Sequence, residues 1–232
     1  MVRSIGYVLS AVMLFSAGVV QAEKPQPPAA NEIQYEVTIT NLTRAQSFTP
    51  QLVVTHDASV GLYEAGQPAS LPLEILAEGG ATGPLTEVLS SLGPLVDEIQ
   101  TIDGLVLPGQ SVTTTISASG KNRSLSFAAM LIPTNDTFVA LDRAALPRSG
   151  SSSYMVAAYD AGTEANDQNC SNIPGPRCGG EGHSPGPNVG DEGFVHVSNG
   201  FHLLPEAEGE VLSPITYDWR NPVARVVVQR LR

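Results

Sequence analysis

The segment from residue 124 to residue 164 constrains the fold more than any other part of this chain. It contains three short apolar runs, at residues 125–133, 137–141 and 154–159, and acidic residues follow each run. Runs of this length that are bounded by turn signals are typical of β-strands. A β-sandwich brings the loops at the ends of such strands together from distant positions in the sequence.

The acidic residues at these strand ends are candidate metal ligands: Asp136, Asp142, Asp160 and Glu164. Carboxylates gathered in one loop cluster repel one another unless a cation joins them. Calcium is the cation that suits flexible loops offering only oxygen ligands. Asp is also an ordinary turn residue, because its short side chain hydrogen-bonds to its own backbone. The residues by themselves therefore leave a calcium site and plain turn chemistry open.

Residues 1–22 have the organisation of a secretory signal peptide. Arg3 precedes an apolar stretch at residues 5–20, and Val20-Gln21-Ala22 supplies a small-residue cleavage pattern. The stretch is too short and too weakly flanked for a convincing membrane span. We therefore expect a secreted or periplasmic protein, cleaved near Ala22, that does not span the membrane.

The rest of the chain predicts one domain. Residues 23–32 form a Pro-rich tether, and residues 33–232 suit a single β domain with long loops. The formal net charge is −11, which argues against a nucleic-acid partner because phosphates require a basic surface. With 22 Gly, 18 Pro and only 15% charged residues, the composition favours a turn-rich β architecture.

Further strands follow from period-two patterns. Tyr35, Val37 and Ile39 alternate with polar residues, as in a half-buried strand. Similar signals occur at residues 48–55, 111–119 and 223–231, and the last run is apolar on both faces, as expected of a central strand. The hairpin-like connections favour antiparallel pairing. We therefore predict an all-β, antiparallel sandwich.

Helical spacing of apolar residues is strong between residues 84 and 99. Pro84 suits a first helical turn, and Gly93-Pro94 interrupts the pattern because proline lacks a backbone donor. The spacing predicts a helix over residues 84–92 and a second turn or short helix over residues 94–101.

Residues 165–193 are rich in Gly, Pro and Asn without periodicity, which predicts a long surface loop. Cys170 and Cys178 lie in this loop, in the sequence CSNIPGPRC. A closely spaced cysteine pair in an exported protein predicts a local disulfide. A metal site would need further ligands in the right geometry, and only His183 lies nearby.

Two patterns invite an enzymatic interpretation. Residues 182–186 (GHSPG) have the letters of a hydrolase nucleophile elbow, but Pro185 and Pro187 forbid the helix that must follow the serine. The second pattern is a set of residues at apparent strand ends and beside the turn Asn199-Gly200: His56, Asp57, His196 and His202. A hydrolase would need them to converge, and their spacing matches no known ligand or catalytic motif.

Three blocks carry a resemblance to a known family: SFAAMLIPTNDTFVALD, AAYDAGTE and the closing ARVVVQRLR. They resemble the spondin domain of F-spondin and mindin, and most closely the stand-alone spondin-domain proteins of bacteria. The resemblance implies a β-sandwich similar to synaptotagmin-type calcium-binding domains. It also implies one bound calcium, held by acidic residues in strand-end loops.

Matched residue by residue, the resemblance assigns the calcium ligands to Asp142, Asp160 and Glu164. Glu164 stands where the animal pattern has Asp, and its longer arm changes the reach of the carboxylate. Supplementary ligands are expected among Asn135, Asp136, Asn166 and Asp167.

The expected function is therefore that of an exported, non-enzymatic, calcium-binding module. By analogy with the animal members, it would serve adhesion or recognition of a surface glycan, a protein or a lipid head group. The alternative is a periplasmic metal-dependent hydrolase that uses His56, Asp57, His196 or His202.

Overall fold

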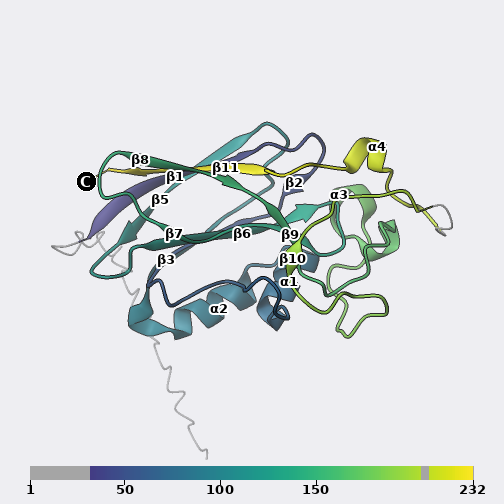
Figure 1. Ribbon diagram of the computed structural model, residues 1–232, viewed down its shortest axis with the longest axis horizontal. Coiled ribbons are helices and arrows are strands. Elements are labelled where there is room, and N and C mark those ends of the chain that lie inside the picture. Colours follow the sequence, from purple (N-terminus) through teal and green to yellow (C-terminus); the bar gives the residue numbers. More distant parts are fainter. Residues whose placement is uncertain (1–31, 205–208, 232) are drawn as a thin grey trace, which may run out of the picture.

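The computed structural model describes residues 32–204 and 209–231, so the predicted signal peptide and nearly all of the tether lie outside the described residues. Two antiparallel sheets pack face to face, as the sequence predicts (Figure 1). The four-stranded sheet has the order β5 (Ser111–Ala118), β1 (Ile33–Asn41), β11 (Ala224–Arg230) and β8 (Ser151–Val156). The seven-stranded sheet has the order β10 (His196–Val197), β9 (Ala158–Asp160), β7 (Thr137–Ala145), β6 (Ser124–Ile132), β3 (Gln51–His56) and β4 (Val96–Ile102), and β2 (Ser47–Phe48) pairs with β6.

The four-stranded sheet buries one face only. Along β1, Tyr35, Val37 and Ile39 point into the sandwich, while Thr38 on the other face shares a 2.9 Å hydrogen bond with Thr113 of β5. Strand β11 lies between β1 and β8, which confirms the predicted central strand. This alternation of apolar and polar residues is what a half-solvated antiparallel sheet requires.

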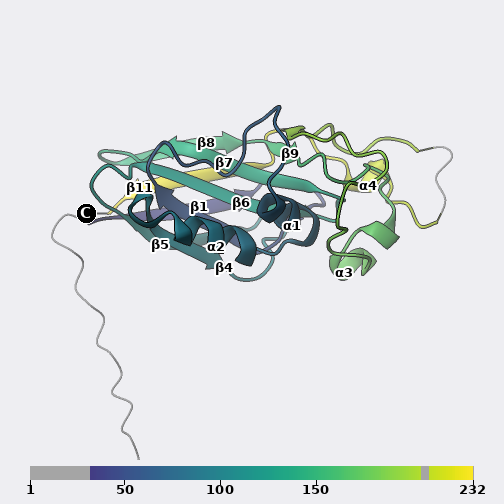
Figure 2. The same ribbon diagram turned by 90° about the horizontal axis from the view of Figure 1, so that it is seen from below.

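The seven-stranded sheet is covered on both faces, and every residue of its strand β6 is buried. Phe127, Ala129 and Leu131 face the core between the sheets. Ala128 faces a second core under the helices α1 (Leu71–Gly79) and α2 (Gly83–Ser91). Figure 2 shows these two helices beside β6. Because both faces are apolar, β6 reads in the sequence as a continuous apolar run.

The helical prediction is correct for α2, but within residues 94–101 it is correct only for a short turn at the start, and the rest is a strand. A short 3₁₀ turn, η1 (Gly93–Leu95), leads directly into strand β4. Val96 and Ile99 both pack against the core under the helices, although they are three residues apart. A bulge makes this possible, because Ile99 pairs with Val54 whereas Val96 pairs with His56. The extra residue gives a strand the spacing of a helix.

Helix α1 was not expected from the sequence. Pro72 lies in its first turn, Leu73, Leu76 and Ala77 form its buried face, and Gly80 ends it in the left-handed conformation. The remaining helices are single turns: η2 (Cys170–Asn172), α3 (Gly175–Cys178) and α4 (Pro214–Tyr217). Within residues 32–204 and 209–231, no helix combines the length and the apolar character needed to cross a membrane.

Truncation of Phe127 tests the importance of the core between the sheets. Its side chain is fully buried in β6, so Phe127→Ala should lower the free energy of unfolding by about 3–5 kcal/mol, measured by urea denaturation. Val189→Ala is the control, because Val189 is 99% exposed and its truncation should change stability by less than about 0.5 kcal/mol. Equal effects of the two substitutions would contradict this account of the core.

Candidate metal centre

Adjacent strands of the larger sheet bring acidic residues together at one end of the molecule. Asp136 lies in the turn between β6 and β7, directly before Thr137. Thr137 pairs with Asp160 at the end of β9, and Asp160 pairs with His196 of β10. Glu164 follows in the turn after β9. The segments therefore meet as the sandwich topology predicts, at the end where the long loop of residues 165–193 begins (Figure 1).

The turn after β9 wraps around the carboxylate of Asp136. Its Oδ2 accepts hydrogen bonds from the backbone N–H groups of Thr163, at 2.7 Å, and Glu164, at 3.1 Å. Asp136 is 0% exposed, yet its Oδ1 has no hydrogen-bond partner among the residues that the structure describes. Such an atom is costly to bury unless something else satisfies it.

Gly162 is needed for this turn. Its φ is +67°, and a Cβ added to it would lie 2.4 Å from the carbonyl oxygen of Phe194. Its N–H donates to Asp160 Oδ1 at 2.9 Å, so the same residue orients a second carboxylate. A residue with a side chain would therefore displace the loop that contains Phe194.

Glu164 completes the cluster. It is 7% exposed, and its Oε1 accepts a 2.6 Å hydrogen bond from Ser184 Oγ in the long loop. Its Oε2 is buried without a partner. Two of the three carboxylates thus each have one oxygen that no donor within residues 32–204 and 209–231 reaches.

The pKa values of these acids show that burial disfavours their charged forms. Burial, and then the nearby charges of Asp160 and Glu164, raise the pKa of Asp136 well above its usual value. Burial also raises the pKa of Asp160. The pKa of Glu164 rises to about 7 through burial, with further contributions from Glu78 and other acids. Burial therefore disfavours the ionised form of all three acids.

The described residues supply little positive charge to this cluster. The ion pairs found there include none from Lys or Arg to Asp136, Asp160 or Glu164, and His196 Nε2 lies 3.5 Å from Asp160 Oδ1. A calcium ion fits this donor set, because carboxylate oxygens are its preferred ligands and two of them lack partners.

The ligand atoms of this cluster nevertheless do not form one of the closest groups in the structure. Among the described residues, two groups bring three carboxylate or imidazole ligand atoms within 4.8 Å of one another. They are Asp160 with Glu192 and His196, and Glu74 with Glu78 and His183. Asp136, Asp160 and Glu164 are not among these groups, so their ligand atoms do not all lie within 4.8 Å of one another.

Asp142 does not join this cluster. Strand β7 continues past it to Ala145, so the expectation that the strand ends there is wrong. Asp142 accepts 2.9 Å hydrogen bonds from Leu62 N–H and Ser126 Oγ. It lies on the order of 15 Å along β7 from Thr137, the partner of Asp160. Asp136, which was predicted only as a supplementary ligand, lies in the cluster in place of Asp142.

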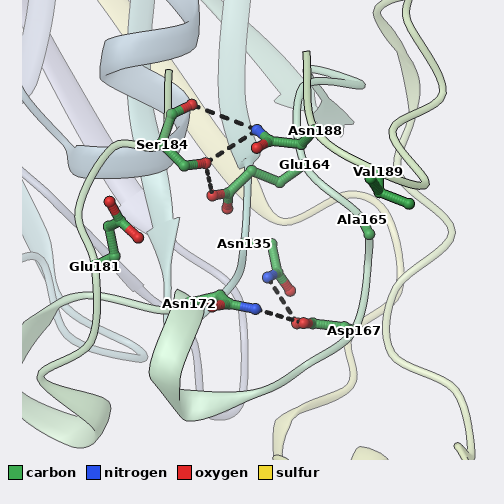
Figure 3. Close-up of a pocket in the computed structure, with 9 residues that line it drawn as sticks. All are labelled: Asn135, Glu164, Ala165, Asp167, Asn172, Glu181, Ser184, Asn188 and Val189. Carbon is green, nitrogen blue, oxygen red and sulfur yellow. Dashed lines mark hydrogen bonds between the residues drawn. The ribbon is translucent and has the colours of Figure 1, made fainter. Parts of the chain in front are cut away.

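The other expected ligands surround the cluster. Asn166 donates to Asp160 Oδ2 at 2.9 Å, which orients that carboxylate. Asn135 donates to Asp167 Oδ1 at 3.0 Å, and both line a neighbouring pocket of about 230 Å³. Figure 3 shows Glu164 on one side of this pocket and the Asn135–Asp167 pair on the other.

The sequence patterns did not indicate that Ser184, Glu78 and Glu192 would lie at or beside this cluster. Ser184 N–H donates to Glu78 Oε2 at 2.9 Å, while its hydroxyl bonds to Glu164. Glu78 lies beside Leu76 and Ala77 on the buried face of α1. An acid on an apolar helical face is a detectable signal, but it required the prediction of α1.

The predicted disulfide between Cys170 and Cys178 is present. It closes the first part of the long loop, where Glu181 N–H also donates to the carbonyl of Ser171 at 3.0 Å. These contacts hold the chain directly before His183 and Ser184.

The residues of the hydrolase alternative do not converge. His56 is buried in β3, where its Nε2 lies 2.7 Å from Ser126 Oγ. Three strands separate β3 from the His196 of β10, which corresponds to about 19 Å at the usual strand spacing. Asp57 caps a turn at Ser59, and His202 is exposed.

Ser126 also contacts Asp142, so His56, Ser126 and Asp142 form a buried chain of polar groups. The hydroxyl lies between the acid and the imidazole, whereas a catalytic triad places the imidazole in the middle. We interpret this chain as a satisfied polar network of the larger sheet.

The comparison with family models agrees with the architecture. The Spondin_N model matches residues 38–172, more than half of the chain, from β1 through the first cysteine of the disulfide. The matched region contains Asp136, Asp160 and Glu164, and it ends before His183 and Ser184. No curated protein matches the chain. On the strength of the family match and the sandwich fold, the chain belongs to the Spondin_N family.

Proposed function

We propose that this protein is an exported, non-enzymatic β-sandwich module that binds one calcium ion through Asp136, Asp160 and Glu164. One observation carries the proposal: Asp136 is completely buried, has a carboxylate oxygen without a partner, and adjoins two further buried acids. An ion with oxygen ligands removes both the repulsion and the unmet hydrogen-bonding capacity.

Each ligand is held by its own contacts. The N–H groups of Thr163 and Glu164 hold one oxygen of Asp136, which leaves Oδ1 free for the ion. Gly162 N–H and Asn166 orient Asp160. Ser184 orients Glu164 and leaves Oε2 free. Asn135, Asn166 and Asp167 are assigned to the support of the site, because their side chains already bond to other protein groups.

The calcium ion would act as a structural element of the binding end. It would fix the turn after β9 and, through Ser184, the long loop that carries the disulfide. The family match and the disulfide are consistent with an extracellular module. A secreted or periplasmic location and recognition of a surface glycan, protein or lipid head group belong to this proposal.

Calcium dependence of the melting temperature tests the site. Wild-type protein should melt at higher temperature in saturating calcium than in chelator, because ligand binding at 100 times Kd adds about 2.7 kcal/mol. Asp136→Asn keeps the size of the side chain and removes its charge. We expect this variant to be at least as stable as wild type in chelator and to lose the response to calcium.

Asp142→Asn is the matched control, because Asp142 satisfies the family pattern equally well but lies away from the cluster. It should lose some stability and keep the full calcium response. A response lost in Asp142→Asn and kept in Asp136→Asn would overturn the ligand assignment. No response in wild type would overturn the calcium proposal itself.

The pH dependence of the calcium-free protein is a second test. The pKa values of Asp136, Asp160 and Glu164 are raised in the folded state, so the folded protein holds protons that the unfolded chain releases. The free energy of unfolding should therefore fall as the pH rises from about 4.5, the ordinary pKa of a glutamate, to about 7, the pKa of Glu164 in the folded protein. Urea denaturation of the metal-stripped protein measures this slope.

Saturating calcium should remove most of this slope, because bound carboxylates remain ionised. Glu78, Glu192 and His196 also face these groups, so the comparison with and without calcium isolates the ligands. Stability of the metal-stripped protein that rises from pH 5 to pH 8 would contradict the account.

A further inference from the structure

A second group of potential ligands lies between helix α1 and the long loop. Glu74 and Glu78 are four residues apart on α1, so their side chains share one face of the helix. His183 Nε2 lies 3.0 Å from Glu74 Oε1 and 4.0 Å from Glu78 Oε2. One ligand atom from each residue lies within 4.8 Å of the others, a spacing that a single ion can span.

Glu78 provides an independent indication of a ligand. It is 1% exposed, and in the described part of the chain its Oε1 has no hydrogen-bond partner. Its Oε2 accepts the N–H of Ser184 at 2.9 Å, so the carboxylate is fixed beside His183. Burial of a carboxylate with an unsatisfied oxygen next to a second acid is costly unless a cation is bound.

An ordinary ion pair explains only part of this arrangement. A surface contact between Glu74 and His183 would be common and would contribute little. It does not account for Glu78, which a second carboxylate on the same helical face would repel. A cation that accepts electron pairs from all three side chains accounts for the whole set.

The loop is closely fitted to the helix at this point. The carbonyl oxygen of Gly182 lies 2.4 Å from where a Cβ of residue 79 would be, so Gly79 allows the approach. This contact places His183 over the last turns of α1. A pocket of about 350 Å³, lined in part by Glu74, Thr163 and Pro185, adjoins the group and offers a path for an ion to enter.

We propose that Glu74, Glu78 and His183 bind a divalent transition-metal ion, for which zinc is the best probe. Two carboxylates and one imidazole are ligands of such ions, and the set contains no thiolate that would favour softer metals. An imidazole distinguishes this site from the oxygen-only calcium site. Three protein ligands leave a fourth tetrahedral position for water or for a donor group of a bound partner.

This site would be a feature of the long loop of this chain. The Spondin_N match ends at residue 172, and His183 lies beyond it. Ser184 follows His183 and bonds to Glu164, so the ion would also fix a support of the calcium site. The site uses none of the three calcium ligands, so it can be tested with or without bound calcium.

The test is zinc titration of the mature chain by calorimetry, in saturating calcium and again without calcium. We expect one zinc equivalent to bind under both conditions. His183→Ala and Glu78→Gln should each weaken binding by at least about tenfold. Cobalt substitution should give visible absorption bands that are lost in His183→Ala.

Two histidine variants serve as controls. His202→Ala removes an exposed imidazole outside both groups and should bind zinc like wild type. His196→Ala removes the imidazole of the neighbouring Asp160–Glu192 group and should also leave zinc binding unchanged. Because the His183 side chain is only partly buried, His183→Ala remains decisive even where Glu78→Gln fails to fold.

Zinc binding that survives His183→Ala, or that disappears in His196→Ala, would overturn the assignment. An absence of zinc binding to wild type at micromolar concentrations would overturn the site itself. Loss of the calcium response alone, with zinc binding intact, would contradict the proposed function and leave this site standing.

Discussion

Strand β6 is buried on both faces, and the arrangement of the molecule follows from that constraint. A strand with two apolar faces needs a layer on each side, and the two layers here are of different kinds. The four-stranded sheet covers one face, and α1 and α2 cover the other. The turn after β6 carries Asp136, and the helical layer carries Glu74 and Glu78. Packing of one strand thus brings two acidic groups to the same end of the molecule.

The high density of buried acids at this end is the second constraint. Burial raises the pKa values of Asp136, Asp160, Glu164 and Glu78, and several of these acids raise the pKa of a neighbour as well. The described ion pairs bring only histidines, His183 and His196, to the acids of these two groups. Protonation or bound cations must therefore compensate the charge. Protonation alone would leave Asp136 Oδ1, Glu164 Oε2 and Glu78 Oε1 without hydrogen-bond acceptors, which is why we favour ions.

Much of the sandwich could be predicted from the sequence because period-two patterns report one-sided burial directly. Tyr35, Val37 and Ile39 are an example. The disulfide between Cys170 and Cys178 could also be predicted, because the two cysteines are close in sequence and the chain carries a predicted export signal. Residues 94–101 could not be predicted this way, because a bulge in β4 places Val96 and Ile99 on one face at a helical spacing. Periodicity cannot distinguish a bulged strand from a helix over so few residues.

The site was only partly predictable, for a different reason. Asp136 and Asp142 both fit the pattern of acids near the end of an apolar run, and the pattern does not say where strand β7 ends. The β7–β9 pairing decides, because Thr137 lies opposite Asp160 and Asp142 lies further along the strand. Ser184 is distant in sequence from Glu78 and Glu164, which it contacts, so local patterns carry no information about these contacts. Glu78 becomes a detectable signal only once α1 is predicted.

Ser184 connects the two acidic groups through its backbone N–H and its hydroxyl. Its N–H holds Glu78 and its Oγ holds Glu164, so an ion at either group restrains a residue that orients a ligand of the other. Binding of the first ion would include the entropy cost of ordering the shared loop. The second ion would then bind to a loop that is already ordered, without that cost. Such coupling is reciprocal by thermodynamic necessity, so calcium would favour the transition-metal ion by the same factor as the reverse. The segment that resembles a hydrolase elbow thus has a structural explanation as the link between the two acidic groups.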